Sequence, residues 1–182
     1  APEDLALVRG DPTERRRFLD EVLIMRAPRL AGVRSDYDRV LKQRNALLRQ
    51  GAGDAEFDPW EIEAAAAGET LATSRQHYVD QLRLHLMHFA DRLIPELGLP
   101  SLDLSRGWDS DVDLAEALAS RRGRDRERGH TTRGPHRADW TLTFEHAVRR
   151  EHPSRGEEKL VALAFLLAQA QFHAQVRGHW PL

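Results

Sequence analysis

The sequence predicts a mainly α-helical (α+β) protein in which a long antiparallel helical arm packs on a small part with a few short strands. Three observations support this fold class. Apolar residues recur at three- and four-residue steps over two long stretches, as they do along one face of a helix. A short loop separates these stretches, which favours an antiparallel pair. Two later segments alternate apolar and polar residues, as short strands do.

Size and composition limit the possible classes of protein. The 182 residues are enough for one domain with an appended subdomain, and we expect a helical arm over residues 1–100 and a small α+β subdomain over residues 101–182. Hydrophobic residues make up 41% and charged residues 31%, which excludes a disordered chain. The formal net charge of -2 gives no global argument for nucleic-acid binding, so that argument must rest on local patches.

The expected location is the cytoplasm. No signal peptide opens the chain, and the longest uncharged apolar stretch, Leu160–Ala168, is far too short to cross a bilayer. The absence of cysteine excludes disulfides, thiolate zinc sites and cysteine nucleophiles, and it is compatible with a reducing compartment.

Two helices are expected at the start of the arm. Asp11 suits a helix cap, Pro12 suits the first turn, and Glu14 stands where a capping box needs its carboxylate. Pro28 interrupts this helix or begins the next one. The second helix has an apolar face formed by Leu30, Val33, Tyr37, Val40, Leu41, Leu47 and Leu48.

A third helix completes the predicted arm. Gly51–Asp54 indicates a turn or loop, and a helical segment then runs from about Pro59 to Leu93. Pro95 and Pro100 end it. The two long helices on either side of the short loop form the antiparallel pair.

The remaining elements belong to the smaller subdomain. Short strands are expected around Leu102 and Leu104 and again over Trp140–Phe144. A helix is expected from Val112 to about Arg122. The last helix runs from residue 155 to about residue 176, and its almost continuously apolar middle predicts that it is buried.

The segment before the last helix is the strongest candidate for phosphate binding. It reads His152-Pro153-Ser154-Arg155-Gly156-Glu157-Glu158-Lys159. A serine followed by a glycine at a helix start exposes backbone N–H groups at the positive end of the helix dipole, which suits a phosphate oxygen. Ser154 and Glu157 also fit a capping box that needs no ligand, so both interpretations stay open.

A second candidate is the turn Gly134-Pro135-His136-Arg137. Gly-Pro forces a turn, from which His136 and Arg137 emerge beside the second strand. The Arg137 guanidinium suits a phosphate or a carboxylate in a forked geometry. The alternative is a structural turn in which Arg137 pairs with Asp139.

A basic run is the third candidate. It consists of Arg121, Arg122, Arg124, Arg126, Arg128, Arg133 and Arg137, diluted only by Asp125 and Glu127. Seven arginines against two acids give a local charge of +5. The five from Arg121 to Arg128 are candidates for contact with DNA phosphates. The alternative is a solvated, mobile surface, which charge runs often form.

No metal site or catalytic residue is predicted. His85 and His88 lie one helical turn apart, but no third ligand is indicated. No Gly-x-Ser-x-Gly elbow occurs, so an independent hydrolase has no supporting constellation.

Four ordered blocks resemble the RecF family of bacterial recombination mediators. The opening block, Ala1–Pro12 with Arg15–Asp20, is similar to the stretch that enters the family's arm domain, and Tyr37 with Val40–Leu48 resembles the arm's most recognisable helix. Gly134–Asp139 matches the family's Gly-Pro-His-Arg turn. Ser154–Lys159 lies where the ABC-type signature motif belongs. Together the blocks cover nearly the whole chain.

The resemblance implies the arm and a remnant of an ABC-type ATPase head, with ATP and magnesium as cofactors of the full-length family. In such homodimers two heads sandwich ATP, which would place Ser154, Arg155, Gly156 and Lys159 at the composite ATP site in trans to a partner's P-loop. Binding of single- or double-stranded DNA is implied, as is cooperation with RecO and RecR proteins in loading recombinase onto gapped DNA. These roles belong to DNA repair, recombination, replication and the SOS response, with no membrane partner. The Gly134–Arg137 turn would support the ATP site or a DNA-facing surface.

The sequence departs from the family pattern in the parts that hold ATP. It contains no Gly-x-x-x-x-Gly-Lys-Ser/Thr loop, and it stops at Leu182 before the acidic pair that would position magnesium. Pro153 replaces the usual Leu of the signature, and Glu157 replaces the usual Gln. A carboxylate beside phosphates is repelled in a low-dielectric site. We therefore expect that the chain alone neither binds ATP tightly nor hydrolyses it.

Two functions follow from these observations. The preferred one is the arm and signature part of a DNA-repair ATPase. The alternative is a helical protein-interaction scaffold with no nucleotide or DNA role, which the seams at Leu30–Leu48 and Leu71–Leu93 suggest. Removing the charges of Arg121, Arg122 and Arg124 separates them, because only the first function predicts weaker DNA binding with a flatter salt dependence.

Overall fold

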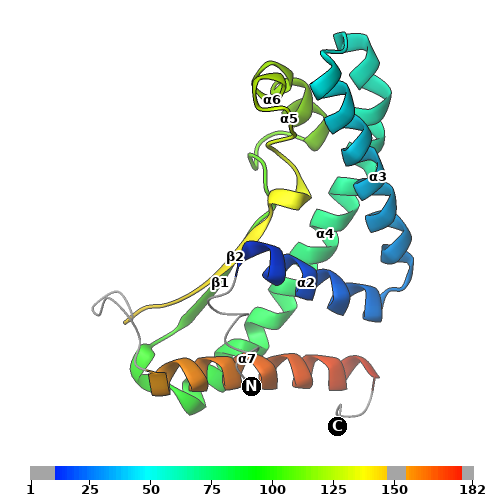
Figure 1. Cartoon of the computed structure of the whole chain (residues 1–182). Coiled ribbons are helices and arrows are strands. Elements are labelled where there is room, and N and C mark those ends of the chain that lie inside the picture. Colours follow the sequence, from blue (N-terminus) through cyan, green and yellow to red (C-terminus); the bar gives the residue numbers. More distant parts are fainter. Residues whose placement is uncertain (1–10, 147–154, 178–182) are drawn as a thin grey trace. The chain divides into compact units, whose positions relative to one another are not determined.

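The protein is mainly α-helical with one small sheet, as the sequence predicts (Figure 1). The computed structural model describes residues 11–146 and 155–177. Its main elements are α2 (Pro12–Arg26), α3 (Arg29–Gln50), α4 (Asp54–Leu93), β1 (Pro100–Ser105), α5 (Leu114–Ala119), α6 (Arg122–Arg128), β2 (Asp139–Phe144) and α7 (Arg155–Arg177). Two short 3-10 helices, η1 (Pro95–Leu97) and η2 (Pro135–Arg137), precede the two strands.

The chain forms two compact units, which we call the sheet unit and the arm unit. The sheet unit consists of Ala1–Phe18, His77–Leu104 and Trp140–Leu182, and the arm unit consists of Leu19–Gln76 and Ser105–Asp139. Helix α4 contributes residues to both. The compact units therefore cut across residue 100, and the division into residues 1–100 and 101–182 stays a prediction.

The first helix begins where the sequence predicts. The Thr13 N–H donates to Asp11 Oδ1 at 2.6 Å, and α2 starts at Pro12. This hydrogen bond holds the pKa of Asp11 below its ordinary value. Helix α2 ends at Arg26 and α3 begins at Arg29, so Pro28 separates the two helices.

Helix α4 begins at Asp54 rather than near Pro59, which corrects the predicted start. Gly51, with φ of 68°, ends α3 in the left-handed conformation. The Gly53 N–H then donates to Glu56 Oε1 at 2.9 Å and so gains a partner at the helix start. Pro59 lies inside α4. Proline favours the first helical turn, which is why the sequence pattern points to it as the start.

The core of the arm unit joins α3, the first half of α4 and α5. Its buried members are Tyr37, Val40, Ala64, Leu71, Ala72, Trp108, Leu114, Ala117 and Leu118. The α3 members lie on the predicted apolar face. Burial of each large apolar side chain contributes about 1.5–3 kcal/mol, so this cluster stabilises the unit.

The two predicted strands pair in an antiparallel sheet. Just outside their ends, the Glu145 N–H donates to Leu99 O at 3.2 Å and the His146 N–H donates to Leu97 O at 3.0 Å. The start of β1 therefore lies beside the end of β2. Both strands contribute to the sheet unit.

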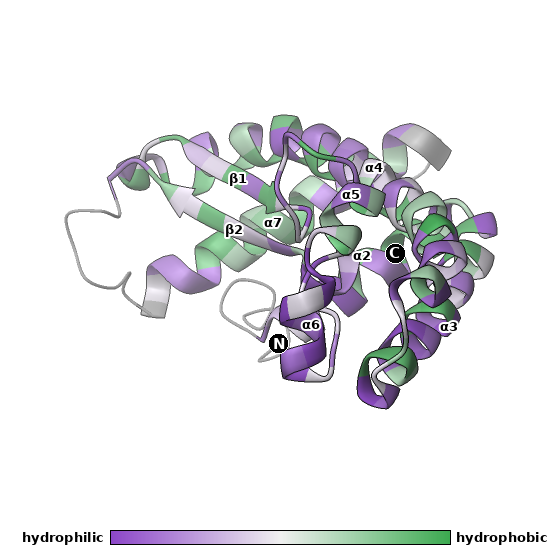
Figure 2. Cartoon of the chain, turned by 90° about the horizontal axis from the view of Figure 1, so that it is seen from above, coloured by the Kyte–Doolittle hydropathy of each residue, from purple (hydrophilic) through white to green (hydrophobic). Residues whose placement is uncertain are grey.

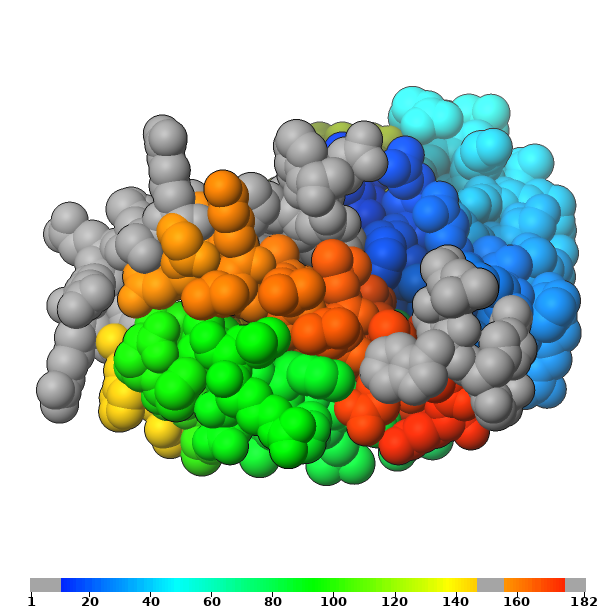
Figure 3. Space-filling model, turned by 90° about the horizontal axis from the view of Figure 1, so that it is seen from below, coloured from blue at the N-terminus to red at the C-terminus, as the bar shows by residue number. Residues whose placement is uncertain are grey.

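Helix α7 packs on the second half of α4 within the sheet unit. Figure 3 shows α7, orange to red, along the green surface to which that half belongs. The Phe172 ring lies 5.5 Å from the Tyr78 ring and 5.7 Å from the His85 ring, measured between centroids. Leu163 is 43% exposed, however, so only one face of α7 is buried. This corrects the expectation that the whole middle of the helix is covered.

Part of the basic run, Arg122–Arg128, forms helix α6. Helix α6 is hydrophilic along most of its length (Figure 2). Its Asp125 nevertheless has a fully buried side chain, with 0% exposure.

Among the residues that the structure describes, no helix is both long enough and apolar enough to span a membrane.

Candidate functional site

Arg44 is the centre of a buried polar network in the arm unit. Its side chain is 1% exposed. Nε donates to Glu61 at 3.0 Å, and Nη2 donates to Leu118 O at 3.0 Å. Nη1 donates to Asp125 at 2.7 Å and to Thr131 Oγ1 at 2.9 Å. A buried charge is tolerated only when it is paired and hydrogen-bonded, and this network provides both.

The same network fixes the loop that follows α6. The Thr131 N–H and hydroxyl both donate to Asn45 Oδ1, at 2.8 Å and 2.7 Å. The Thr132 N–H and hydroxyl both donate to Asp125 Oδ1, at 3.1 Å and 2.6 Å. Two successive loop residues are therefore held by α3 on one side and by α6 on the other.

Sequence reasoning misses Arg44, Asp125 and Thr131 as a group. One signal for Arg44 is present, because residues 37, 40, 44 and 48 share one face of α3 and a charged residue thus stands on the apolar stripe. Asp125 gives no such signal. It looks like one acid in a basic run, and its burial depends on a partner 81 residues away in the sequence.

Two glycines in contact shape the start of the Gly134–Arg137 turn. Gly134 has φ of 133° and ψ of 176°, a combination that essentially only glycine adopts. A Cβ at Gly134 would lie 2.4 Å from the Tyr37 hydroxyl oxygen. Gly107, with φ of 97°, accepts the Gly134 N–H at 3.1 Å, and a Cβ on Gly107 would lie 2.1 Å from Gly134 O. Both positions therefore require glycine.

A buried ion pair holds the next residue of the turn. Arg75 Nη1 donates to Pro135 O at 2.7 Å. The other side of the same guanidinium donates to both carboxylate oxygens of Asp20, at 2.8 Å each. Both side chains are 5% exposed, so the pair is shielded from water. This forked geometry gives a fixed position to the carbonyl of Pro135.

His136 is held through both of its ring nitrogens. Its Nδ1 lies 2.8 Å from the Tyr37 hydroxyl, and its Nε2 lies 3.1 Å from Thr131 O. Because a carbonyl oxygen only accepts, Nε2 carries a proton, and in the neutral imidazole Nδ1 then accepts from Tyr37. Burial raises the pKa of the Tyr37 hydroxyl above its usual range, while Arg75 and Arg44 act in the opposite direction. Tyr37 therefore stays a neutral donor.

Arg137 is the exposed end of this turn. Its Nη2 lies 3.4 Å from Thr131 O, at the outer limit for a hydrogen bond. No ion pair joins Arg137 to Asp139 within the described part of the chain, so the sequence-based alternative of a paired arginine is not what the structure contains. The guanidinium is available to an outside group.

The arginines of α6 do not form one free basic surface. Arg122 donates to Asp58 and, from Nε, to Glu61 Oε2 at 3.0 Å. Hydrogen bonding to Glu61 raises the pKa of Arg122 further above its usual range. Arg126 donates to Ala52 O at 2.9 Å and to Asp54. These two candidates serve the internal structure of the arm unit.

The other three α6-region candidates differ in exposure. Arg121 lies 4.0 Å from Asp109, the limit of an ion pair. Arg124 and Arg128 are exposed, and no ion pair holds either of them among residues 11–146 and 155–177. Only these two positions still match the predicted solvent-facing charge.

The predicted signature segment is partly described. Ser154 lies outside the described residues, and so does the side chain of Arg155. Helix α7 begins at Arg155, and Gly156 and Lys159 are exposed in its first turns. Glu157 stands in the first turn, where an acidic residue favours the helix dipole. Both the phosphate and the capping interpretations are compatible with this start.

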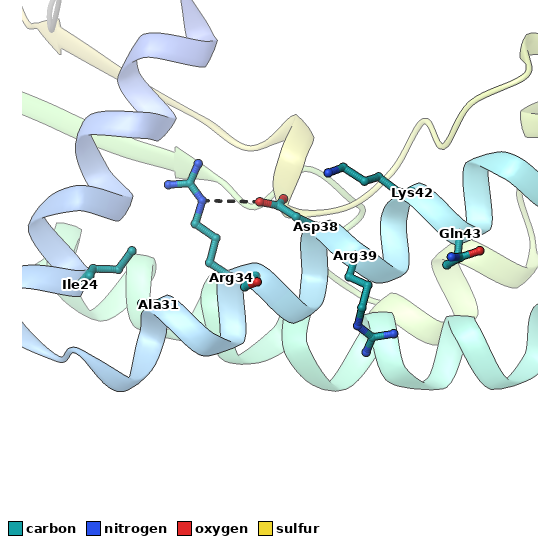
Figure 4. A pocket seen from close by; sticks show the side chains of 8 residues that line it. Ile24, Ala31, Arg34, Asp38, Arg39, Lys42 and Gln43 are labelled. Atoms are coloured by element: carbon teal, nitrogen blue, oxygen red, sulfur yellow. Dashed lines mark ion pairs between the residues drawn. The ribbon is translucent and has the colours of Figure 1, made fainter.

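A groove of about 460 Å³ lies along α3 of the arm unit (Figure 4). It is lined by Ile24, Ala31, Arg34, Ser35, Asp38, Arg39, Lys42 and Gln43. Arg34 lies 3.9 Å from Asp38, as the dashed line shows, and Arg39 pairs with Glu63 outside the groove. Lys42 is the cation there that is not engaged within the described residues. The groove thus has little unpaired positive charge for an anion.

Metal ligands do not gather anywhere in the described part of the chain. No group of three or more histidine, aspartate or glutamate side chains there could hold a metal ion. His85 stacks on Phe172 at an interplanar angle of 29°. Burial, followed by the nearby His88, lowers the pKa of His85 below its ordinary value.

Comparison with known proteins gives one consistent relationship. Over all 182 residues the sequence is 46% identical to the DNA replication and repair protein RecF of Stenotrophomonas maltophilia (strain R551-3), of which it covers 50%. It is 45% identical, with the same coverage, to the protein of that name from Xanthomonas euvesicatoria pv. vesicatoria (strain 85-10). The chain spans about half the length of the curated relatives it matches. No family model matches the chain.

Two solved structures have the same fold. Both are of the recombination mediator protein RecF in the RecFOR pathway, one with ATPrS and one with ATP, and they superpose with TM-scores of 0.84 and 0.87. The sequence identities are 21% and 20%, and each match covers all of this chain and 52% of the solved one. At this identity the likeness shows the fold alone.

Proposed function

We infer, because the chain is similar to RecF proteins along its whole length, that it acts in DNA repair and recombination as a RecF-like protein. The observation that carries this proposal is 46% identity over every residue of the chain to a DNA replication and repair protein. The matching fold is consistent with it, because a solved RecF structure superposes on the whole chain with a TM-score of 0.87.

The start of α7 contributes the signature side of a composite ATP site in this proposal. Ser154, Arg155, Gly156 and Lys159 would contact phosphate held by the P-loop of a second RecF subunit. Three features of this chain fit such a group: a 23-residue helix that begins here with the positive end of its dipole, an exposed glycine that leaves the backbone open, and a nearby lysine. Glu157 opposes it by charge.

ATP, with magnesium, would supply the phosphoryl group. Two subunits together would form the site at which ATP is hydrolysed. The residues of this chain would bind and orient that phosphate from one side. They do not fit a whole nucleotide, because the sequence has no phosphate-cradling loop of its own. The proposal therefore needs a dimer, and we expect no ATP hydrolysis by the chain alone.

DNA and the RecO and RecR proteins are the proposed partners. The exposed arginines Arg124 and Arg128 are the α6 positions suited to a DNA phosphate, since they have no carboxylate partner among the described residues. The proposed outcome is loading of recombinase onto gapped DNA in the cytoplasm. Each of these partners is a proposal for this chain.

Equilibrium binding of a fluorescent ATP analogue, with magnesium, tests the one-sided ATP site. The purified chain is titrated alone over a range of protein concentrations. We expect no tight, saturable binding, because the signature side by itself contributes few phosphate contacts. Tight binding by the chain alone would mean that it contains a complete nucleotide site, and the one-sided proposal would be wrong.

A helical scaffold for other proteins is the second candidate function. The specific observation in its favour is that Arg122 and Arg126 are bound internally by Glu61, Asp58 and Asp54. Helix α6 then serves to hold α3 and α4 together instead of facing DNA.

The exposed arginines distinguish the two functions. Replacement of Arg124 and Arg128 by alanine leaves the internal ion pairs intact. Weaker binding of gapped DNA, with a smaller salt dependence, favours the DNA-repair function. Undetectable DNA binding by both the wild type and the variant favours the scaffold.

A further inference from the structure

We propose that the Gly134–Arg137 turn is a phosphate-binding element, in which Arg137 contacts the phosphate and buried residues behind it fix its position. The inference rests on the proposed function only in choosing DNA as the first source of phosphate to test. It does not involve the signature segment or the arginines of α6.

The turn is held by more interactions than a change of chain direction requires. Gly134 and Gly107 both adopt positive φ and touch backbone to backbone. The buried Arg75–Asp20 pair holds Pro135 O, and Tyr37 holds the His136 ring. Unusual backbone conformations and buried ion pairs are each costly, and they persist where the surroundings impose them. Their convergence on one surface turn indicates that its geometry matters.

The Thr131 carbonyl connects these interactions to Arg137, because it lies next to both the His136 ring and the Arg137 guanidinium. The Thr131 carbonyl accepts from His136 Nε2 at 3.1 Å and lies 3.4 Å from Arg137 Nη2. Thr131 itself is 1% exposed and is fixed by Arg44 and Asn45. The exposed guanidinium thus rests against one of the best-anchored groups of the arm unit.

A guanidinium held in this way is suited to an oxyanion. Its fork matches two oxygens of one phosphate, and a contact that is already oriented loses less conformational freedom on binding. The single long hydrogen bond to Thr131 O leaves most of the Arg137 donors available. A ligand with two acceptor oxygens would accept hydrogen bonds from these donors.

The local charge favours phosphate over carboxylate. Between Glu127 and Asp139 the chain contains Arg128, Arg133 and Arg137 and no acidic residue. Arg133 lies 3.6 Å from Asp109, so part of its charge is compensated. The remaining positive potential attracts the anion of higher charge more strongly. The shared chemistry is a phosphate group, from the DNA backbone or from a free nucleotide.

The test is fluorescence anisotropy of a labelled gapped DNA duplex, titrated with the whole chain at several salt concentrations. Arg137→Ala removes the guanidinium. Arg137→Lys keeps the charge without the fork. Arg29→Ala is the matched control, because Arg29 is also exposed in the arm unit and no interaction holds it among the described residues. Thermal unfolding verifies that all four proteins are equally folded.

We expect Arg137→Ala to weaken DNA binding about tenfold and to lower the salt slope by about 0.9, the effect of one lost phosphate contact. Arg137→Lys should fall between wild type and Arg137→Ala. Tyr37→Phe tests the positioning role: it should weaken binding while keeping the wild-type salt slope, because the arginine is present but less well held.

Displacement of the DNA by ATP identifies the source of the phosphate. Displacement at millimolar ATP from the wild type, but not from Arg137→Ala, assigns a free nucleotide, and no difference assigns the DNA backbone. Equal DNA affinity and ATP sensitivity of Arg137→Ala and Arg29→Ala would overturn the inference. So would a wild-type chain that binds neither ligand, although the signature site would still stand on its own test.

Discussion

Arg44 Nη1 and Asp125 Oδ2 lie 2.7 Å apart, with side chains that are 1% and 0% exposed. This contact joins the middle of α3 to the middle of α6. It places a charged pair where the α3 sequence otherwise presents an apolar face to the core. The stability of the arm unit should therefore depend on Arg44 more than on any exposed arginine.

Replacement of Arg44 by methionine should lower the free energy of unfolding by about 3–5 kcal/mol, because it leaves the buried Asp125 carboxylate without its partner. Urea unfolding measures the loss. Arg49→Ala, also on α3 but exposed, is the matched control and should change stability by less than about 0.5 kcal/mol. The double change Arg44→Met with Asp125→Leu should recover part of the loss. A cost of Arg44→Met no larger than that of Arg49→Ala would contradict the role of the pair.

Gly134→Ala should destabilise the protein by at least about 2 kcal/mol, since it combines a conformation closed to alanine with a clash against the Tyr37 hydroxyl. Gly32→Ala in α3 is the control, because a Cβ there meets nothing within 4 Å. That change should stabilise by about 0.5–1 kcal/mol through helix propensity. Thermal unfolding of the two variants should move in opposite directions. Equal shifts would mean that the turn tolerates a side chain.

Tyr37 should make the protein less stable in alkali. Burial raises the pKa of its hydroxyl, so the folded state holds this proton more tightly than the unfolded state does. The resulting contribution is complete below the ordinary value of about 10 and falls above it by up to about 1.4 kcal/mol per pH unit. Tyr37→Phe should lose this extra decline. Parallel pH profiles for the wild type and Tyr37→Phe would show that the hydroxyl is not shielded.

Arg122→Ala should cost about 1–3 kcal/mol of stability, because it removes charged hydrogen bonds to Glu61 and Asp58. Arg124→Ala, two residues along α6, should cost less than about 0.5 kcal/mol. Chemical unfolding compares the two. Similar costs would indicate that the internal and exposed arginines of α6 are not distinct, and the DNA assays on Arg124 would need a stability correction.

Local patterns predict most of the elements. The three- and four-residue steps locate α3 and most of α4, and alternation locates β1 and β2. The start of α4 is wrong by a few residues because Pro59 has the preference of a first-turn residue. Helix α6 is missed because its arginines look solvated when their partners at Asp54 and Glu61 are unknown.

The candidate site is predicted less completely, for a physical reason. The Gly-Pro pair and the exposed Arg137 are visible in the sequence. The residues that hold them are not, because Tyr37 contacts His136 across 99 positions and Arg75 contacts Pro135 across 60. Such pairings arise from packing of distant segments, and no local period encodes them.

ATP hydrolysis by a full-length RecF relative whose own signature motif is disabled, measured with this chain added in the presence of DNA, tests the proposed signature role of Ser154–Lys159 directly. We expect the wild-type chain to restore hydrolysis and a chain with Ser154→Arg not to restore it, since only the former offers an intact signature to the relative's ATP. Failure of the wild-type chain to restore hydrolysis, or equal restoration by both chains, would show that the segment has no such role.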